Sequence, residues 1–150
     1  MPVMSRIRYL GLKWQAMAWL VFGGKAQARG IFDQMLAEFP GDAYALASKA
    51  TLLVQTGNRL AALPLFESLV ALHPGQAAHW FNLGFVLEEL ERYEQAEAAF
   101  RRATELDPQI DRAWYGLGLV LIRLRRHDEA VAALKQNADL EVVRITPQIQ

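Results

Sequence analysis

The 150-residue chain contains no cysteine, which excludes disulfides, thiolate catalysis and zinc–cysteine sites. It has only three histidines, and the spacings of His73, His79 and His127 match no metal-binding motif. Basic and acidic residues balance, with 16 of each and a net charge of zero. That balance does not point to nucleic acid or to an anionic membrane as a partner.

Strand-like alternation is missing before the last residues, so no glycine-rich phosphate loop follows a strand. A group of carboxylates does occur, but it lies at helical spacing beside arginines, which favours a solvated, ion-paired surface over acid–base chemistry. The group comprises Glu88, Glu89, Glu91, Glu94 and Glu97. We interpret Arg123, Arg125 and Arg126 in the same way, as a solvated turn. We therefore expect no catalytic residue, no metal and no cofactor.

The N-terminal segment is the longest apolar stretch, yet it is shorter than the ~20 apolar residues that span a bilayer. Arg6, Arg8 and Lys13 precede apolar residues 16–22, and residues 26–28 resemble the cleavage site of a secretory signal. Ala28, however, also falls on the repeat described next, and cleavage there would destroy its first unit. We expect a cytoplasmic protein, with export or membrane association through this segment as the alternative.

A period of 34 residues runs through the chain. Prolines recur at this interval, with a phenylalanine eight residues before each and an alanine twelve residues before each. Leu134 and Ala130 continue the phenylalanine and alanine series. A fixed period of this length indicates stacked supersecondary units. The three series are Pro40, Pro74, Pro108; Phe32, Phe66, Phe100; and Ala28, Ala62, Ala96.

The third unit carries the clearest motif, Trp80-x2-Leu83-Gly84-x2-Leu87 followed by Ala96-x3-Phe100, Ala103 and Pro108. The fourth repeats it as Trp114-x2-Leu117-Gly118-x2-Leu121. This pattern resembles the tetratricopeptide repeat, a helix–turn–helix unit of 34 residues. The first two units match mainly in their second halves, since Gln15 and Lys49 stand where leucine is expected. The resemblance implies an all-α fold, a right-handed α-solenoid of antiparallel helix pairs.

The repeat also sets the expected boundaries. We divide the chain into a leader (1–8), four units (9–42, 43–76, 77–110 and 111–141) and a tail (142–150). Small residues at the eighth place of each unit predict where its two helices cross closely. Glycine pairs or Gly-Asn mark the first two inter-helix turns. The eighth places are Ala16, Ala50, Gly84 and Gly118.

The end of the chain departs from the period. After Leu134 the phase dissolves, and the residues from Leu140 to Pro147 are apolar and β-branched, which makes a poor capping helix. We therefore expect the last helix to keep an exposed apolar face that supports self-association or a partner. The alternatives are that the tail folds back over that face, or that the chain is part of a longer array.

The resemblance also implies a binding surface, because the first helix of each unit lines a concave groove in this family. The groove set is largely apolar and aromatic, and Phe81, Phe85 and Tyr115 could anchor an amphipathic helix or an apolar peptide. The open alternative is that Phe81 and Phe85 are core residues between repeats. The candidate groove residues are Lys13, Met17, Tyr44, Thr51, Gln55, Phe81, Phe85, Glu88, Arg112, Tyr115, Leu119 and Arg123.

One specialised use of the groove is not expected. Some relatives clamp a partner's C-terminal carboxylate between lysine, asparagine and arginine side chains, but here Met17 stands where asparagine is needed beside Lys13. Our leading hypothesis is a non-catalytic scaffold that binds another protein or peptide, without nucleic acid or membrane as partner. The alternative hypothesis is a membrane-associated assembly factor tethered by the N-terminal basic–apolar segment.

Overall fold

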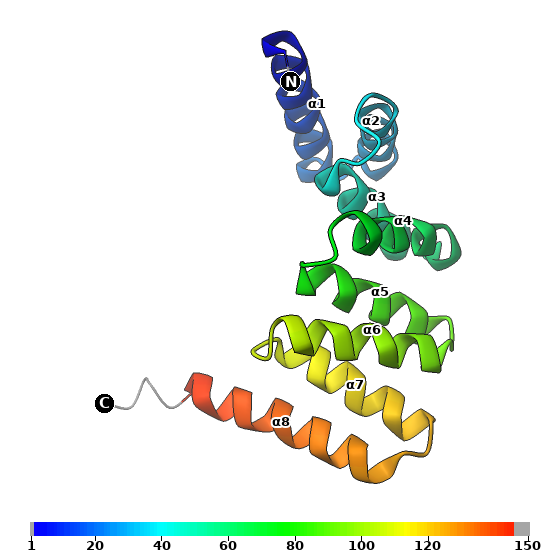
Figure 1. Ribbon diagram of the computed structural model, residues 1–150. Helices are drawn as coiled ribbons and strands as arrows, with labels where there is room; N and C mark the ends of the chain where they lie inside the picture. Colours follow the sequence, from blue (N-terminus) through cyan, green and yellow to red (C-terminus); the bar gives the residue numbers. More distant parts are fainter. Residues whose placement is uncertain (1, 146–150) are drawn as a thin grey trace. The chain divides into compact units, whose positions relative to one another are not determined.

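The computed structural model describes residues 2–145, and this part of the chain is entirely α-helical (Figure 1). It contains eight helices that form four consecutive hairpins, which confirms the all-α fold. The helices are α1 (Val3–Val21), α2 (Lys25–Glu38), α3 (Ala43–Gln55), α4 (Arg59–Leu72), α5 (Ala77–Glu89), α6 (Tyr93–Leu106), α7 (Asp111–Arg123) and α8 (His127–Ile145). They gather into two compact units, Met1–Leu72 and His73–Gln150, which are described separately below.

The helix boundaries follow the repeat inside the array and depart from it at both ends. Helices α3, α5 and α7 begin at the expected unit starts, and a proline follows shortly after α2, α4 and α6. At the N-terminus, α1 already begins at Val3, so residues 3–8 are helical and do not form a separate leader. At the other end, α8 continues through residues 142–145, which were expected in the tail. The rest of the expected tail, residues 146–150, lies outside the described residues.

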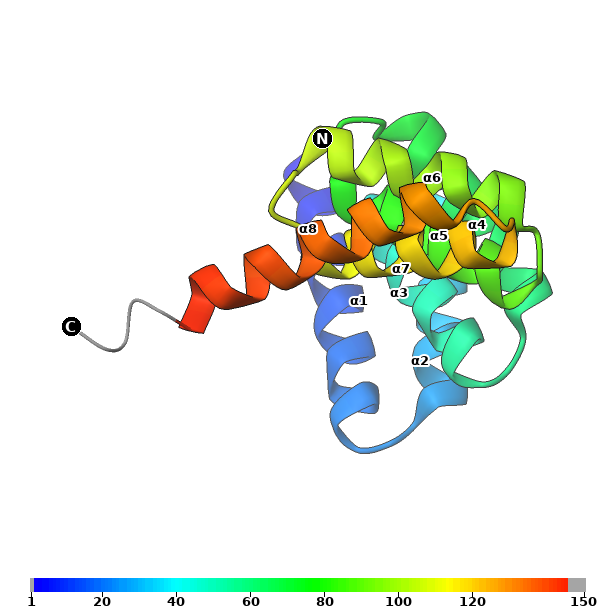
Figure 2. The ribbon, with the colours of Figure 1, turned by 90° about the horizontal axis from the view of Figure 1, so that it is seen from below.

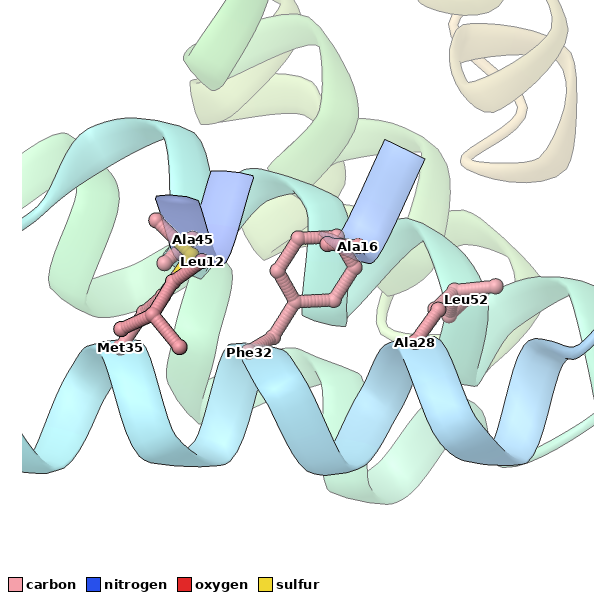
Figure 3. Close-up of a cluster of buried hydrophobic side chains, with 7 residues drawn as sticks. All are labelled: Leu12, Ala16, Ala28, Phe32, Met35, Ala45 and Leu52. Atoms are coloured by element: carbon pink, nitrogen blue, oxygen red, sulfur yellow. The ribbon is translucent and has the colours of Figure 1, made fainter. Parts of the chain in front are cut away.

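The first unit is held together by a tight apolar cluster between its first three helices (Figure 3). Ala16 of α1 and Ala28 of α2 are fully buried, and the Phe32 ring points toward Ala16. Because alanine is small, α1 and α2 approach closely enough for Phe32 to fill the space beside their crossing. Ala28 is therefore part of the core of the first hairpin. Leu12, Met35, Ala45 and Leu52 complete the cluster.

In the second unit, glycine replaces alanine at the crossings, and the helices leave no room for a side chain there. A Cβ atom on Gly84 would lie 2.8 Å from Phe100 Cδ1, and one on Gly118 would lie 2.6 Å from Leu134 Cδ2. Both contacts join the two helices of one hairpin, α5 with α6 and α7 with α8, and the second hairpin is visible in Figures 1 and 2. The eighth place is thus the helix crossing that the repeat predicts.

The turn inside each hairpin has one recurring geometry. The fifteenth place of every unit adopts a left-handed backbone, with φ of +80° at Gly23, +83° at Gly57, +59° at Glu91 and +60° at Arg125. The N–H of the following residue donates to the carbonyl five residues earlier, as Arg92 does to Leu87 at 2.8 Å. This is the Schellman arrangement that ends a helix by pairing its last free carbonyls. The glycines expected to mark the first two turns are confirmed, whereas the other two turns use charged residues.

Between the hairpins of the second unit, a tryptophan fixes the loop. The indole N–H of Trp80 donates to the Pro74 carbonyl at 2.8 Å, and that of Trp114 donates to the Pro108 carbonyl at 2.9 Å. The motif tryptophan and the proline six residues before it therefore form one device, which pairs a backbone carbonyl that proline's ring leaves outside any helix. In the first unit α3 is capped differently, because the Asp42 carboxylate accepts from the Ala45 N–H at 2.8 Å.

Candidate functional site

One continuous face of the second unit carries most of the candidate groove residues. Phe81, Phe85 and Glu88 follow one another at helical spacing on α5, and Arg112, Tyr115, Leu119 and Arg123 do so on α7. Helices α5 and α7 contact each other, so the two rows lie side by side. We call these seven residues the α5–α7 surface.

The first end of the α5–α7 surface combines an aromatic ring with a cation. The Arg112 guanidinium lies 5.1 Å from the centroid of the Phe81 ring, within the range of a cation–π contact. The Phe81 ring also packs against Phe100, with centroids 6.0 Å apart, and is half-buried. The core interpretation therefore holds in part for Phe81, which supports the surface from below.

The middle of the same surface is apolar and open. Phe85 is 39% exposed and Tyr115 is 52% exposed, and Leu119 beside them is half-buried. Phe85 is therefore an exposed surface residue rather than a core residue. Aromatic rings held in this way offer a large contact area at little entropic cost, which is typical of anchoring positions in interfaces.

The far end of the α5–α7 surface carries opposite charges. Burial, together with the negative charge of Glu89, raises the pKa of Glu88 above its usual value, and the nearby positive charge of Arg123 partly offsets this. A carboxylate that is half-buried beside an arginine is costly to desolvate unless it is paired. The surface thus runs from a cation, across aromatic residues, to a carboxylate with its own arginine.

The first unit presents a related but less aromatic face on α1 and α3. The Lys13 ammonium lies 4.3 Å from the centroid of the Tyr44 ring, and Met17, Thr51 and Gln55 are exposed. A shallow pocket of about 250 Å³ opens beside them. Its walls are Leu20, Ala47, Ser48, Thr51, Leu52 and Gln55. All the candidate groove residues of this unit except Met17 come from its two cation–π partners or from α3 next to the pocket.

The two units share a pairing rule that the sequence did not reveal. In each, the fifth place of one hairpin meets the second place of the next, so that a cation faces an aromatic ring. The order is reversed between units: Lys13 faces Tyr44, whereas Phe81 faces Arg112. The signal in the sequence is a Lys or Arg and an aromatic residue 31 positions apart at those two places.

The carboxylate group considered as a source of chemistry is engaged elsewhere. Glu97 and Glu129 form a closed ring of ion pairs with Arg101 and Arg126, each contact being 2.7 Å. This confirms an ion-paired surface around Glu97 and Arg126. Within residues 2–145, no group of three or more histidine, aspartate and glutamate side chains gathers as metal ligands would.

Exposed apolar residues concentrate at the opposite end of the chain from the one expected. On α8, the large exposed apolar residues up to Val143 are Val131, Val142 and Val143. On α1 there are many more, including Trp14 at 70% exposure. The expected self-association through the last helix therefore stays a prediction, while α1 presents the larger apolar face.

Comparison with known proteins identifies this architecture. The family model described as "Tetratricopeptide repeat" matches residues 48–109 and 86–139, which together cover more than half of the chain. The chain belongs to the tetratricopeptide repeat family. Proteins of this family are generally non-catalytic scaffolds that bind other proteins, so the protein is an interaction scaffold at that level of description.

Solved structures of tetratricopeptide repeat proteins named MamA share the fold. The RS-1 ArsTM double mutant of MamA has a TM-score of 0.85 and 25% sequence identity, with 92% of this chain and 78% of that chain covered. MamA 41-end from Desulfovibrio magneticus RS-1 gives 0.83 and 25% over the same shares. Another MamA crystal structure gives 0.84 and 19%, covering 91% of this chain and 80% of that chain. No curated protein matches this chain significantly.

The structure also bears on membrane association of this tetratricopeptide repeat protein. None of the helices in residues 2–145 has both the length and the apolar character needed to cross a bilayer.

Proposed function

We propose that this protein is a non-catalytic scaffold that binds an amphipathic helix or an apolar peptide of another protein on the α5–α7 surface. The observation that carries this proposal is the exposure of Phe85 and Tyr115 side by side, between charged groups at both ends of the surface. Isolated exposed apolar residues are common on proteins, but adjacent aromatic residues on two packed helices are typical of binding sites.

The charges around these aromatic residues suggest the chemistry of the partner. Arg112 keeps its guanidinium above the Phe81 ring, where the ring holds its orientation without neutralising it. Arg123 provides a second cation at the far end, next to Glu88. We infer a partner with apolar side chains at helical or alternating spacing and an acidic residue that meets Arg112. Such charges set orientation and specificity more than affinity.

The first unit offers a second surface that suits the tail of the same partner or a smaller group. Lys13 and Tyr44 supply a cation and a ring, and the shallow pocket beside Thr51 and Gln55 offers hydroxyl and amide groups. Its more polar composition favours adaptable contacts over apolar anchoring. The main binding energy therefore belongs to the α5–α7 surface in this proposal.

We also infer that the scaffold acts in the cytoplasm and retains its N-terminal segment. Removing residues up to Ala28 would take away α1 and uncover Phe32, which is fully buried against Ala16 in the first hairpin. Losing that contact would expose a large apolar side chain whose burial contributes roughly 1.5–3 kcal/mol.

The experiment that tests the proposal compares partner capture by three forms of the full chain. Phe85→Ala with Tyr115→Ala removes both anchors from an exposed surface, so the circular dichroism spectrum should stay unchanged while capture falls at least about tenfold. The matched control is Val131→Ala, which removes an exposed apolar side chain from α8. Capture is measured by affinity purification with cross-linking mass spectrometry. Equal recovery of the same partner by the double variant would contradict the proposal.

A further inference from the structure

The charges of the chain are distributed unevenly, although they sum to zero. The first 32 residues contain five of the 16 lysines and arginines and none of the 16 aspartates and glutamates. The remaining 118 residues therefore carry 11 basic and 16 acidic side chains. The basic residues of the N-terminal segment belong to α1 and the start of α2: Arg6, Arg8, Lys13, Lys25 and Arg29. A segment with only one sign of charge attracts a surface of the opposite sign.

The same segment exposes an apolar stripe along the whole of α1. Six large residues follow one another at intervals of four and three, which places them on one side of the helix. They are between 43% and 80% exposed. The stripe is roughly 28 Å long at 1.5 Å per residue. Its residues are Val3, Ile7, Leu10, Trp14, Met17 and Val21, and we call them the α1 stripe.

The α1 stripe is not the face by which α1 joins the fold. Leu12 and Ala16, the buried residues of α1, lie about 160° around the helix from the centre of the stripe at 100° per residue. At the end of the stripe, Phe22 is 84% exposed in the turn before Lys25. The helix is therefore attached on one side and apolar on the other, with Arg6 at the border of the apolar side. A helix that is apolar on a face the fold leaves open needs another apolar medium to cover it.

We propose that α1 is an interfacial helix, which lays the α1 stripe into the surface of an anionic membrane. Trp14 and Phe22 would enter the boundary between headgroups and acyl chains, and Arg6 and Lys25 would meet lipid phosphates. None of the helices in residues 2–145 can cross a bilayer, so the contact lies along the surface. Pairing of α1 with α1 of a second copy is less favourable, since all charged residues of α1 are basic and like charges would face each other.

The proposal goes beyond the partner-binding role and can fail independently of it. Leu10, Met17 and Val21 also lie at places that the family uses for its groove, but Ile7 and Trp14 do not. Variants at Ile7 and Trp14 therefore test the membrane contact without touching the candidate groove residues.

Vesicle sedimentation of the full chain tests the proposal. We expect binding to vesicles of phosphatidylcholine mixed with phosphatidylglycerol, weak binding to phosphatidylcholine alone, and release on addition of salt. Ile7→Gln with Trp14→Gln should lower the partition coefficient at least about tenfold. Arg6→Gln with Lys25→Gln should lower it by about tenfold on the anionic vesicles only. The matched control is Leu60→Gln with Val131→Gln, which changes two residues that are each 66% exposed and should leave binding within about twofold.

A spin label reports the geometry directly, because the chain has no cysteine and a single introduced one is labelled uniquely. A nitroxide on Ile7→Cys should become accessible to oxygen and protected from a water-soluble nickel reagent when anionic vesicles are added. The same label on Val131→Cys should not change. Equal binding by the stripe variant, equal binding to neutral vesicles, or no vesicle binding combined with stripe-dependent oligomers in light scattering would each overturn the proposal. The last result would assign the stripe to a second copy of the chain.

Discussion

At the residue scale, the most regular feature is the left-handed turn position at the fifteenth place of each hairpin. Glycine occupies it twice, at Gly23 and Gly57, and adopts a positive φ without steric cost. Glu91 and Arg125 hold nearly the same conformation with a Cβ atom, which crowds the following carbonyl oxygen and costs roughly 1 kcal/mol. The hydrogen bonds of the Schellman turn hold these residues in place.

We therefore predict that Glu91→Gly and Arg125→Gly each stabilise the protein by about 0.5–1 kcal/mol, because they relieve that crowding. Urea denaturation followed by circular dichroism measures the effect. Glu91→Ala and Arg125→Ala are the matched controls, since they remove the charge but keep the Cβ atom. A gain in the alanine variants equal to that in the glycine variants would show that charge, not backbone conformation, is responsible.

A second prediction at this scale concerns Tyr9, whose hydroxyl donates to Asp42 Oδ1 at 3.0 Å. Burial, followed by the hydrogen bond to Asp42 and the charges of Asp42 and Tyr44, raises the pKa of Tyr9 from 10.0 to about 12. The folded state thus favours the neutral phenol. Its stabilising contribution is complete below pH 10 and is lost as the pH rises from about 10 to about 12.

The measurement is the urea midpoint of the wild-type protein and of Tyr9→Phe across this pH range. Tyr9→Phe should be the less stable form near pH 8, and the difference should shrink steadily above pH 10. A difference that stays constant up to pH 12 would mean that Tyr9 is not coupled to folding.

At the element scale, the hairpins of the second unit pack around Phe100. A Cβ atom on Gly84 of α5 or Gly116 of α7 would approach the Phe100 ring to 2.8 and 2.6 Å, respectively. The ring is 1% exposed and stands between the two helices. The first hairpin instead combines Ala16 with Phe32, both fully buried, so alanine is accepted where the helices have adjusted to it. Glycine at these two places sets how closely the helices of the second unit approach.

We predict that Gly116→Ala destabilises the protein by about 1–2 kcal/mol, because overpacking outweighs the higher helix propensity of alanine. The matched control is Gly30→Ala in α2, where an added Cβ atom meets nothing within 4 Å. That change should instead stabilise by up to about 1 kcal/mol. Phe100→Leu combined with Gly116→Ala should cost less than the sum of the two single changes in urea denaturation. Strict additivity would separate Gly116 from the ring.

The period predicted the inner helix boundaries well for a physical reason. Proline ends a helix wherever it recurs, and the crossing of small residues fixes where α3, α5 and α7 begin. Neither signal reaches the ends of the chain. Residues 3–8 contain no helix breaker, so α1 extends back to Val3, and α8 continues to Ile145 because no proline interrupts it before that residue.

At the scale of the whole molecule, two kinds of surface stand out, and the sequence predicted them unequally. The family pattern pointed to Phe85 and Tyr115 because their places on the first helix of a hairpin follow from the period. It could not show that Phe81 rests on Phe100 or that Arg112 covers its ring, since these contacts depend on packing between hairpins. Net charge and composition hid the basic, apolar α1 segment, because the acidic residues that balance it lie further along the chain.

These observations describe a scaffold that holds a protein partner on the α5–α7 surface and contacts an anionic membrane through α1. The two roles are carried by different helices, so each can be removed while the other remains. Variants of Ile7 and Trp14 should therefore keep partner capture, and variants of Phe85 and Tyr115 should keep vesicle binding.

The most direct test of the central claim is site-specific photo-cross-linking. A photoreactive amino acid is placed at Tyr115, on the α5–α7 surface, or at Val131, an exposed apolar position on α8. Our account predicts that the probe at Tyr115 cross-links a partner protein through a defined apolar segment, whereas the probe at Val131 yields no such product. Cross-links to the same partner segment from Val131, with none from Tyr115, would contradict the claim.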